Sequence, residues 1–544
     1  MSAGRPRIVI LGGGFAGVYT AMALERRLDG RDDFEIALVN KENYLVFQPL
    51  LPEVISGSIG LTDVVSPIRS LLPRTDLHVR DVESVDLARR EVCTSPGFKP
   101  QPHVIGYDHL VLALGNVTDF RGLPGLPEHA LPFKNLGDAL RLRNHVIRAL
   151  EEAAIERDDA ELRRQLLTFV VAGGGFSGVE VVAELNDFVR RAARRYRGIA
   201  PGEISVLLLH SRDRILPEMD ASLALFAQKI LAARGVEIRL KTRLEAATGY
   251  EAVLKGGERI PTRTLVGTVP SSPHPLVESL PLPKAGHGRL LTDGGLRVQG
   301  EQHVWALGDC ALVSVGSTGA TAPPTAQHAI RQAEVAAHNV VAELRGGAKR
   351  VFDFKGLGTM GSLGRRSAVA QVLGLKLSGF AAWWVWRTVY LMRLPGWGRR
   401  LKVAAAWTLD LVLPAETVQL RLGGSQGIGR EHFEPGQYVF RQGELGDRLY
   451  IILSGEAEVL RADGPGETLL ARLGAGQCFG EMALVQQQAR NASVRCGQTM
   501  DVLSLPKEEF AVLAANLPDL RRSFEQLTAR RSESAQTPLA DSSG

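Results

Sequence analysis

The sequence predicts an α/β fold followed by a smaller all-β domain. In two segments of the chain, a short apolar run leads through a glycine-rich turn into a helix-like stretch. Near the C-terminus, short alternating strands are predicted between glycine turns at Gly436, Gly443, Gly446 and Gly455. Since 544 residues exceed what one hydrophobic core usually holds, we expect three or four domains.

The composition excludes several classes of protein. Hydrophobic residues make up 45% of the chain, which argues against global disorder. A net charge of +5 is too small to indicate nucleic acid binding, although it suits an anionic membrane surface if the charge is local. The four cysteines show no C-x-x-C spacing, so we expect neither a disulfide framework nor a metal site. This cysteine usage fits a reducing compartment. We expect no signal peptide and no spanning helix.

The first repeated segment begins with Arg7–Leu11, whose apolar β-branched residues are typical of a buried parallel strand. Gly12, Gly14 and Gly17 follow in G-x-G-x-x-G spacing and lead into a helix-like stretch. Such glycines allow a tight turn and let backbone amides approach a pyrophosphate at the positive helix end. This context predicts a dinucleotide site.

The second repeated segment, LLTFVVAGGGFSGVEVVAEL, places Gly173, Gly175 and Gly178 in the same spacing. Two complete units predict two dinucleotides. This organisation resembles that of flavoproteins with two dinucleotide-binding domains, which implies FAD in the first unit and a nicotinamide dinucleotide in the second. Asp309, after a strand and a glycine, resembles the aspartate that holds the ribityl chain of FAD in such flavoproteins. The helix entered through Pro323 and Pro324 is expected to point its amino end at the flavin.

Neither unit has the acidic residue that usually binds a ribose hydroxyl at the end of the second strand. Asn40 and His210 occupy those positions. Asn40 still offers a hydrogen bond, whereas His210, with Arg212 nearby, leaves room for a 2′-phosphate, so NADPH stays open beside NADH. The alternative is that both are solvated loop residues.

Five segments together resemble the type II NADH:quinone oxidoreductases: FQPLLPEV, GGGFSGVEVVAEL, RILPEM, ALGDC and PPTAQHA. The resemblance covers about residues 5–416. It implies a single-subunit, non-proton-pumping enzyme that passes electrons from NADH through FAD to a membrane quinone. Sulfide:quinone oxidoreductases share the architecture but need a cysteine pair, and only Cys310 lies near the predicted flavin.

The resemblance assigns catalytic roles to Glu180 and Gln327. Glu180 is expected in the first turn of its helix, with a carboxylate favoured there by the helix dipole as the alternative. Arg331 stands where the family often has a second glutamine. The predicted cofactor-binding residues are Gly12, Gly14, Phe15, Ala16, Gly17, Asn40, Lys41, Gln48, Ala113, Gly115, Gly173, Gly175, Phe176, Gly178, Glu180, His210, Gly308, Asp309, Ala326 and Gln327.

The segment Leu377–Leu413 holds four of the six tryptophans, with arginines interleaved and a break at Pro395 and Gly396. Tryptophan prefers the headgroup level of a bilayer, and arginine extends toward anionic lipid. We therefore expect two short amphipathic helices in the membrane interface, at the cytoplasmic face, in a peripheral protein. The alternative is an ordinary core or dimer helix pair, and the family favours a homodimer.

Residues 420–530 resemble the cyclic nucleotide-binding domain, a β-roll with flanking helices, through the sequence F-G-E-x-A-L and a later R-x-A-S-V. The resemblance implies that Arg490 pairs with the cyclic phosphate and Glu481 with the ribose. The predicted cyclic nucleotide site is Gly480, Glu481, Ala483, Arg490, Asn491 and Ser493, and cAMP and cGMP both stay open. The alternative is a packing module without nucleotide.

The predicted domains are an FAD-binding domain over 1–125 and 290–350, an NAD(P)H-binding domain over 126–289, a membrane-interface segment over 351–416, the cyclic nucleotide-binding domain over 420–530 and a disordered tail over 531–544. The leading hypothesis is an NADH:quinone oxidoreductase regulated by a cyclic nucleotide. The alternatives are a redox signalling protein with slow turnover and an NADPH-preferring flavin reductase.

Overall fold

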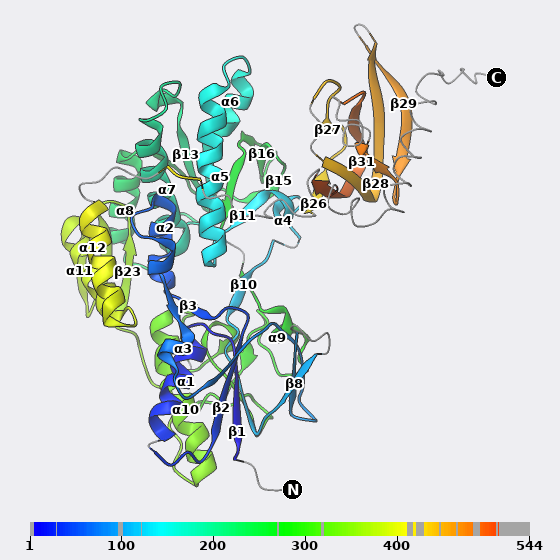
Figure 1. Cartoon of the computed structure of the whole chain (residues 1–544). Coiled ribbons are helices and arrows are strands. Elements are labelled where there is room, and N and C mark those ends of the chain that lie inside the picture. Colours follow the sequence, from blue (N-terminus) through cyan, green and yellow to red (C-terminus); the bar gives the residue numbers. More distant parts are fainter. Residues whose placement is uncertain are drawn as a thin grey trace. The chain divides into compact units, whose positions relative to one another are not determined.

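The computed structural model describes residues 5–28, 30–95, 102–120, 122–268, 271–316, 320–410, 417–419, 429–444, 448–463, 466–481, 490–506 and 510. The chain divides into two compact units (Figure 1). The first comprises Met1–Asp119, Leu131–Arg243 and Val266–Val418, and the second Phe120–Ala130, Leu244–Leu265 and Gln419–Gly544.

The first unit opens with a five-stranded parallel sheet of order β21-β9-β1-β2-β5. Its strands are β1 (Arg7–Leu11), β2 (Glu35–Asn40), β5 (Asp76–Val79), β9 (His109–Leu112) and β21 (Val304–Ala306). Helices α1 (Phe15–Leu28) and α10 (Ala326–Arg345) pack against each other beside this sheet (Figure 1). Except for Arg7 and His109 at their first positions, strands β1 and β9 are apolar and buried, as a sheet covered on both faces requires.

A second five-stranded sheet has the order β11-β18-β12-β13-β14. Its strands are β11 (Ala130–Pro132), β12 (Thr168–Ala172), β13 (Ser205–Leu209), β14 (Val236–Arg239) and β18 (Thr264–Gly267), and the accompanying helices are α5 (Leu136–Ile155), α6 (Ala160–Leu167), α7 (Phe176–Ala193) and α8 (Ala221–Ala233). Strands β12, β13 and β14 are parallel. Both predicted strand–turn–helix units are therefore confirmed, each on its own sheet.

Shorter elements lie along the chain between the strands and helices of the two sheets. They are β3 (Tyr44–Val46), α2 (Pro52–Ser56), β4 (Val65–Pro67), α3 (Ile68–Leu71), β6 (Val82–Asp86), β7 (Glu91–Thr94), β8 (His103–Gly106), β10 (Asn116–Thr118), β19 (Ser271–Pro273), α9 (Pro275–Ser279), β20 (Leu290–Leu291) and β22 (Ala311–Leu312), with the 3-10 turns η1 (Gln48–Leu50), η2 (Leu61–Asp63), η3 (Pro201–Glu203) and η4 (Gly308–Cys310).

After α10 the chain forms an antiparallel sheet of β23 (Gly358–Ser362), β24 (Ala368–Val372) and β25 (Leu375–Ser378). Two helices follow, α11 (Gly379–Arg393) and α12 (Trp397–Asp410), separated at the predicted Pro395–Gly396 break. In the described part of the chain, no helix combines the length and apolar character needed to cross a bilayer.

The second unit contains α4 (Leu126–His129) and the antiparallel strands β15 (Leu244–Ala247), β16 (Glu251–Leu254) and β17 (Arg259–Pro261). Its larger sheet has the order β26-β31-β28-β29, with β27 beside β31 and β30 beside β28. The strands are β26 (Gly429–Phe433), β27 (Tyr438–Phe440), β28 (Arg448–Asp463), β29 (Gly466–Gly474), β30 (Cys478–Phe479) and β31 (Ser493–Pro506), all antiparallel.

The turn predicted at Gly455 is wrong, because β28 runs through that residue as a single strand of 16 residues. Gly455 has φ +86°, and a Cβ there would lie 2.2 Å from the Thr499 carbonyl oxygen. The register against β31 shifts on either side of it, so the glycine serves a β-bulge rather than a turn. The predicted terminal helices after Pro506 fall, except for Phe510, outside the described residues.

Candidate functional site: two dinucleotide loops, a buried carboxylate cluster and a C-terminal cradle

The first glycine loop lies at the carboxyl end of β1, where the Gly12 amide donates to the Val39 carbonyl of β2 at 2.9 Å. A Cβ at Gly17 would lie 1.8 Å from the Gly12 carbonyl oxygen, whereas a Cβ at Gly14 would meet nothing within 4 Å. Gly17 is therefore needed for the turn to close, and Gly14 faces open space. This open space beside the start of α1 fits the pyrophosphate of a dinucleotide.

The second loop repeats this geometry residue by residue. The Gly173 amide donates to the Leu209 carbonyl at 2.9 Å. A Cβ at Gly178 would lie 1.8 Å from the Gly173 carbonyl oxygen, and one at Gly175 would meet nothing within 4 Å. The two loops therefore present two matching cradles, one on each parallel sheet.

Asn40 and His210 close these loops and are not solvated loop residues. The Gly13 amide donates to Asn40 Oδ1 at 2.8 Å, and the Gly174 amide donates to His210 Nδ1 at 3.1 Å. Burial lowers the pKa of His210, with the Arg212 charge acting in the same direction. Because Nδ1 accepts, the neutral ring carries its proton on Nε2, which has no partner among the described residues.

Substitution of His210 by aspartate is expected to shift selectivity toward NADH. A carboxylate keeps an acceptor for the Gly174 amide, accepts a hydrogen bond from a ribose hydroxyl and repels a 2′-phosphate. We expect the ratio of kcat/KM for NADH to that for NADPH to rise about tenfold, equivalent to ~1.4 kcal/mol. Steady-state kinetics with both nucleotides measures this ratio, and an unchanged ratio would contradict the assignment.

Strand ends of the first sheet meet at the edge that carries the first loop (Figure 1). The Ala113 amide donates to the Leu11 carbonyl at 2.9 Å, and the Leu307 amide donates to the Leu112 carbonyl at 3.1 Å. Asp309 follows in η4 with the Lys134 ammonium 4.0 Å away, and burial raises the pKa of this carboxyl. The structure therefore brings Gly12, Gly14, Phe15, Ala16, Gly17, Asn40, Ala113, Gly115, Gly308 and Asp309 to this edge, while Lys41 and Gln48 are exposed beyond the ends of β2 and β3.

Cys310 is buried behind this edge, and its thiol contacts the carbonyls of Leu112 and Leu307. Burial raises its pKa to about 11, so it is not a thiolate at neutral pH. No disulfide joins the four cysteines, Cys93, Cys310, Cys478 and Cys496.

Gln327 and Glu180 both bind strand β23. Gln327 accepts from the Leu357 amide at 3.1 Å and donates to the Gly358 carbonyl at 3.0 Å. Glu180 accepts from the Ser362 amide at 3.0 Å, beside the Phe176 ring. Since these two bonds are four residues apart on one strand, the side chains lie about 13 Å apart along it.

Glu180 is the fifth residue of α7, so its predicted place in the first helical turn is wrong. The helix begins at Phe176 after a Gly175 cap, and the carboxylate bonds to β23 rather than to the helix terminus. Burial raises its pKa to about 8, and the nearby Glu53 charge adds to the shift. At neutral pH this carboxyl holds a proton.

Arg331, at the position where a second glutamine was expected, stacks its guanidinium over Phe354 at 5.1 Å from the ring centroid. His328 meets the same ring edge-on. The arginine therefore belongs to an aromatic cluster around Phe354.

Sequence reasoning missed a cluster of buried carboxylates beside Glu180. Glu53 in α2 is 4% exposed and Glu184, one turn after Glu180, is 6% exposed. Burial raises the pKa of both. Glu53 accepts from the Trp407 indole and lies 3.9 Å from Arg387, whose guanidinium is held between Trp383 and Trp407. The segment FQPLLPEV contained this glutamate, but only the fold shows what surrounds it.

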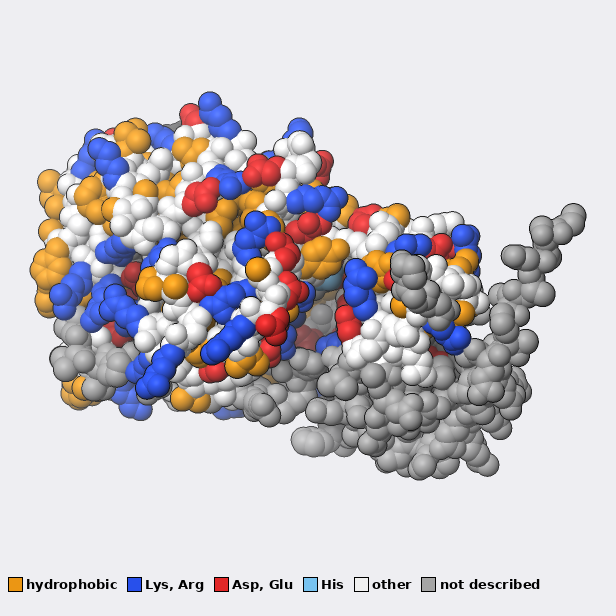
Figure 2. Space-filling model, turned by 90° about the horizontal axis from the view of Figure 1, so that it is seen from above, with side chains coloured by type: hydrophobic (Ala, Val, Ile, Leu, Met, Phe, Trp, Pro, Cys, Tyr) orange, Lys and Arg blue, Asp and Glu red, His pale blue; other side chains and the backbone are white. Residues whose placement is uncertain are grey.

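Helices α11 and α12 bury one face and expose another. Trp386 and Trp407 are buried, whereas Trp384 is 57% exposed and Trp397 is 77% exposed. Exposed apolar residues continue along this surface at Leu375, Phe380, Met392, Leu401 and Leu409. Figure 2 shows hydrophobic side chains gathered, with Lys and Arg beside them, at the left edge, where Figure 1 draws these helices.

The C-terminal sheet buries both of its predicted charged ligands. Arg490 is 4% exposed and donates to the carbonyls of Gly480 at 2.7 Å and Arg448 at 2.8 Å, with its guanidinium 4.0 Å from the centroid of Phe440. Glu481 is 2% exposed, and Ser493 accepts from the Gln442 amide at 3.0 Å. Asn491 is exposed, and Ala483 lies outside the described residues. Arg490 therefore holds backbone carbonyls at the place where a phosphate was expected.

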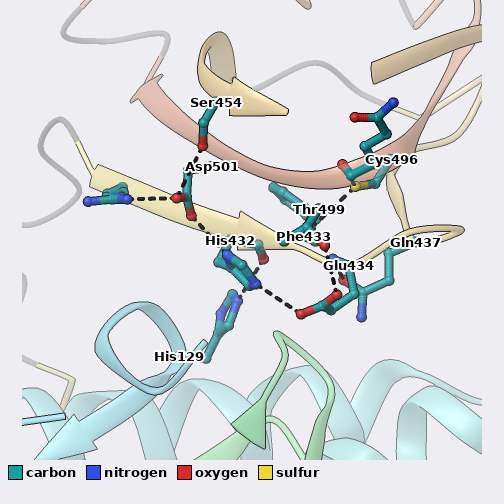
Figure 3. A network of polar contacts seen from close by, with 11 residues as sticks. His129, His432, Phe433, Glu434, Gln437, Ser454, Cys496, Thr499 and Asp501 are labelled. Carbon is teal, nitrogen blue, oxygen red and sulfur yellow. Dashed lines mark hydrogen bonds and ion pairs between the residues drawn. The ribbon is translucent and has the colours of Figure 1, made fainter. Parts of the chain in front are cut away.

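A polar network joins β26 to β31 and α4 within the second unit (Figure 3). The His432 ring contacts Asp501 at 2.8 Å and Glu434 at 3.1 Å, and its carbonyl lies 3.3 Å from His129 Nε2. Although burial opposes it, hydrogen bonds to the two carboxylates raise the pKa of His432. The network holds β26, the first strand of the C-terminal antiparallel sheet, against α4.

Among the described residues, His109, His303 and Glu343 are close enough to share a metal ion. His109 Nδ1 accepts from the Trp305 indole at 3.4 Å, and Glu343 is paired with Arg297 and Lys349. Because two cations already neutralise the carboxylate, we assign no metal to this group.

Family models match three consecutive parts of the chain. The pyridine nucleotide-disulphide oxidoreductase family matches residues 6–333, the NDH2 C-terminal domain matches 357–412 and the cyclic nucleotide-binding domain matches 430–516. The demethylphylloquinone reductase NdbB of Synechocystis sp. is 33% identical over 75% of this chain and 96% of the relative. The type II NADH:quinone oxidoreductase NdhA of Mycobacterium tuberculosis is 32% identical over 75% of this chain and 88% of the relative.

The chain belongs to the type II NADH:quinone oxidoreductases. This oxidoreductase shares its fold with NDH2 of Plasmodium falciparum in complex with NADH, at a TM-score of 0.70 and 19% identity, over 76% of this chain and all of the other. It is an NADH dehydrogenase that transfers electrons to a quinone, and it carries a cyclic nucleotide-binding domain after the enzyme part. FAD and NADH agree with the family.

Proposed function

We propose that the oxidoreductase binds FAD at the first loop, NADH at the second and a membrane quinone near Gln327, and that a cyclic nucleotide bound to the C-terminal domain regulates it. The observation that carries the enzymatic part is that Gln327 and Glu180 both hydrogen-bond to the backbone of β23 and the residue before it, about 13 Å apart along the strand. Gln327 is the second residue of α10, which packs beside the first sheet, and Glu180 lies in α7, beside the second sheet. Strand β23 is therefore bonded to one helix from each sheet.

The residues present fit FAD at the first loop. The open space at Gly14 accommodates a pyrophosphate, and Asp309 and Asn40 lie at the same sheet edge for hydroxyl groups of the cofactor. The bound flavin would supply hydride acceptance from NADH and electron delivery to quinone. Phe176, Gly178 and His210 would hold the nicotinamide dinucleotide, with Ala326 and the amino end of α10 beside the flavin.

Glu180 would hold the proton that accompanies quinone reduction. Its pKa of about 8 keeps the carboxyl protonated at neutral pH and allows it to release the proton to a developing anion. Gln327 is fixed by two backbone bonds and would orient the quinone ring.

The exposed apolar and cationic surface of α11 and α12 would dock on an anionic membrane from the cytoplasmic face, where the quinone is dissolved. Flotation with vesicles of phosphatidylglycerol tests the docking, and protein that stays at the bottom of the gradient, apart from the vesicles, would contradict it.

Three further features remain predictions. They are a homodimer, a β-roll for the C-terminal domain and the domain boundaries 1–125, 126–289, 290–350, 351–416 and 420–530.

The C-terminal domain would bind cAMP or cGMP by exchanging the carbonyl partners of Arg490 for the cyclic phosphate. Such an exchange would release the contacts of Arg490 with Gly480 and Arg448, so binding favours a second arrangement of the sheet. This coupling is the regulatory step that we propose.

Substitution of Arg490 by glutamine is expected to lower nucleotide affinity about 10- to 100-fold, since a charge-assisted bond contributes ~1.5–3 kcal/mol. Calorimetric titration with cAMP and with cGMP measures it. The matched control is Arg495→Gln, five residues later on β31, where the arginine pairs with Glu458. Equal affinity in wild type and Arg490→Gln would contradict the site.

One experiment tests the whole proposal. Purified, FAD-loaded protein oxidises NADH on quinone-containing liposomes, with and without saturating cAMP or cGMP. Fast oxidation altered by one nucleotide is the expected result. Fast oxidation indifferent to both would overturn the regulation, and bound flavin without turnover would favour a redox signalling role.

A further inference from the structure

A pocket of about 430 Å³ opens beside the first turn of α12. Its walls come from two distant parts of the first compact unit, with η2, β4 and α3 on one side and residues 395–402 on the other. A volume of this size falls within the range of small-molecule sites. None of its lining residues belongs to the two glycine loops or to the carboxylates around Glu180, so the reduction of quinone does not account for it.

Two cationic side chains line the pocket from α12. Arg399 and Lys402 are three residues apart, and side chains at this spacing lie on the same face of a helix. The Arg399 guanidinium donates to the Thr62 carbonyl at 2.9 Å, which fixes it across the pocket. Since a guanidinium has five N–H donors, this single bond leaves others for a ligand. The Lys402 side chain is exposed and adds three more donors.

One carboxylate lies in the same pocket, and a backbone amide already occupies it. Asp63 accepts from the Gly60 amide at 3.2 Å, at the start of η2. Burial lowers the pKa of Arg399, and the Asp63 charge opposes that shift. With two cations beside one carboxylate, the pocket keeps an excess of positive charge, which favours an anionic ligand.

The rest of the lining offers hydroxyl groups and open space. Thr62, Ser66 and Ser70 supply side-chain hydroxyls. A Cβ at Gly396 or at Gly398 would meet nothing within 4 Å, so these two glycines leave the pocket open. Guanidinium, ammonium and hydroxyl donors around an open space are the groups that bind a phosphate ester.

The side chains beside the pocket match the headgroup level of a bilayer. Trp397 is 77% exposed and Leu401 is 60% exposed, and one turn of α12 separates them on a common face. Tryptophan prefers the interface between hydrocarbon and water. Because Trp397 directly precedes Gly398 in the chain, insertion of the indole would bring the pocket to the level of the lipid phosphates.

We propose that this pocket binds the phosphodiester headgroup of an anionic glycerophospholipid, which rests on the proposed docking of α11 and α12 on a membrane. Arg399 and Lys402 contact the phosphate oxygens, and the serine hydroxyls contact the glycerol of the headgroup. The acyl chains leave past Trp397 and Leu401 into the bilayer. A soluble phosphate ester has the same charged group, but the exposed indole and leucine beside the pocket favour a lipid.

Flotation of full-length, FAD-loaded protein with phosphatidylglycerol vesicles, repeated at rising salt concentration, tests the pocket. Salt screens the attraction between exposed charges and the membrane surface, whereas contacts inside a pocket are screened less. Lys402→Gln removes one charge from the pocket. The matched control is Arg400→Gln, which removes the same charge on another face of α12, where the arginine donates to the Leu394 carbonyl. Gly398→Leu fills the pocket without a change of charge, and the thermal midpoint of each variant checks folding.

At high salt, Lys402→Gln and Gly398→Leu are expected to need about tenfold more phosphatidylglycerol than wild type for half-maximal flotation, since a charge-assisted contact is lost or blocked. Arg400→Gln is expected to float like wild type at that salt concentration. If Lys402→Gln and Gly398→Leu floated like wild type, or if Arg400→Gln lost as much as Lys402→Gln, the pocket would be overturned while the docking stood. Wild type that fails to float even at low salt would overturn the docking, and the lipid ligand with it.

Glycerol 3-phosphate offers the same phosphate ester without a bilayer. Calorimetric titration is expected to show much weaker binding than the vesicles give, because Trp397 and Leu401 then have no acyl chains to contact. Binding of glycerol 3-phosphate as tight as that of the vesicles, and lost in Lys402→Gln, would replace the lipid with a soluble ligand and so contradict the proposal.

Discussion

Replacing Gly17 with alanine is expected to give protein that folds poorly and carries no flavin. The new Cβ would lie 1.8 Å from the Gly12 carbonyl oxygen, which belongs to the backbone of the loop and has no rotamer to adopt. Overpacking a core already costs ~1–3 kcal/mol, and displacement of the backbone between β1 and α1 should exceed that range. The ratio of flavin absorbance to protein absorbance, with the thermal midpoint, measures the effect.

Gly14→Ala separates folding from cofactor binding in the same loop. Its Cβ meets nothing within 4 Å, so the apo protein should melt like wild type while FAD affinity falls, because the methyl enters the cradle. Gly202→Ala, also with open space around it, is the control for alanine substitution as such. A flavin content in Gly17→Ala equal to that of wild type would show that the loop tolerates the contact.

Replacing Glu180 with glutamine is expected to produce the largest loss of quinone reductase activity. The amide keeps an oxygen for the Ser362 N–H but has no proton to give, and loss of a positioned general acid typically costs ~10²- to 10⁴-fold. Reduction of bound flavin by NADH should continue. Separate measurement of the two half-reactions therefore shows the defect in reoxidation alone.

The pH dependence gives the same residue a second signature. Because burial raises the pKa of Glu180 to about 8, the protonated form predominates below that pH and disappears above it. Wild-type reoxidation should fall as the pH rises through about 8, whereas Glu180→Gln should be slow and flat. An exposed glutamate, Glu161, provides the matched control as Glu161→Gln. If the reoxidation rate of Glu180→Gln still declined above pH 8 as in wild type, titration of Glu180 would not be the cause of that decline.

Local patterns predicted the parts of the fold that depend on local chemistry. The two glycine loops, the helix with Ala326 and Gln327 at its start, and the two helices on either side of Pro395 each leave a signal within about 20 residues. The bulge at Gly455 was misinterpreted because glycine with positive φ serves turns and bulges equally, and only the opposite strand distinguishes them.

The carboxylate cluster could not be predicted in the same way. Glu53 and Glu184 come from two helices, and each alone resembles an ordinary surface acid in the sequence. Their burial depends on how α2 and α7 pack, which periodicity does not specify. The carbonyl partners of Arg490 are likewise a property of the folded sheet, although the arginine itself was found from its motif.

Asn40 and His210 are chemically different side chains that meet the same backbone requirement in the two glycine loops. Both glycine turns require an acceptor for one amide, and an amide oxygen fills that requirement in one turn while an imidazole nitrogen fills it in the other. In this chain either kind of acceptor is therefore sufficient to pair the loop amide. A search pattern that demands aspartate or glutamate at this position would miss both of its glycine loops.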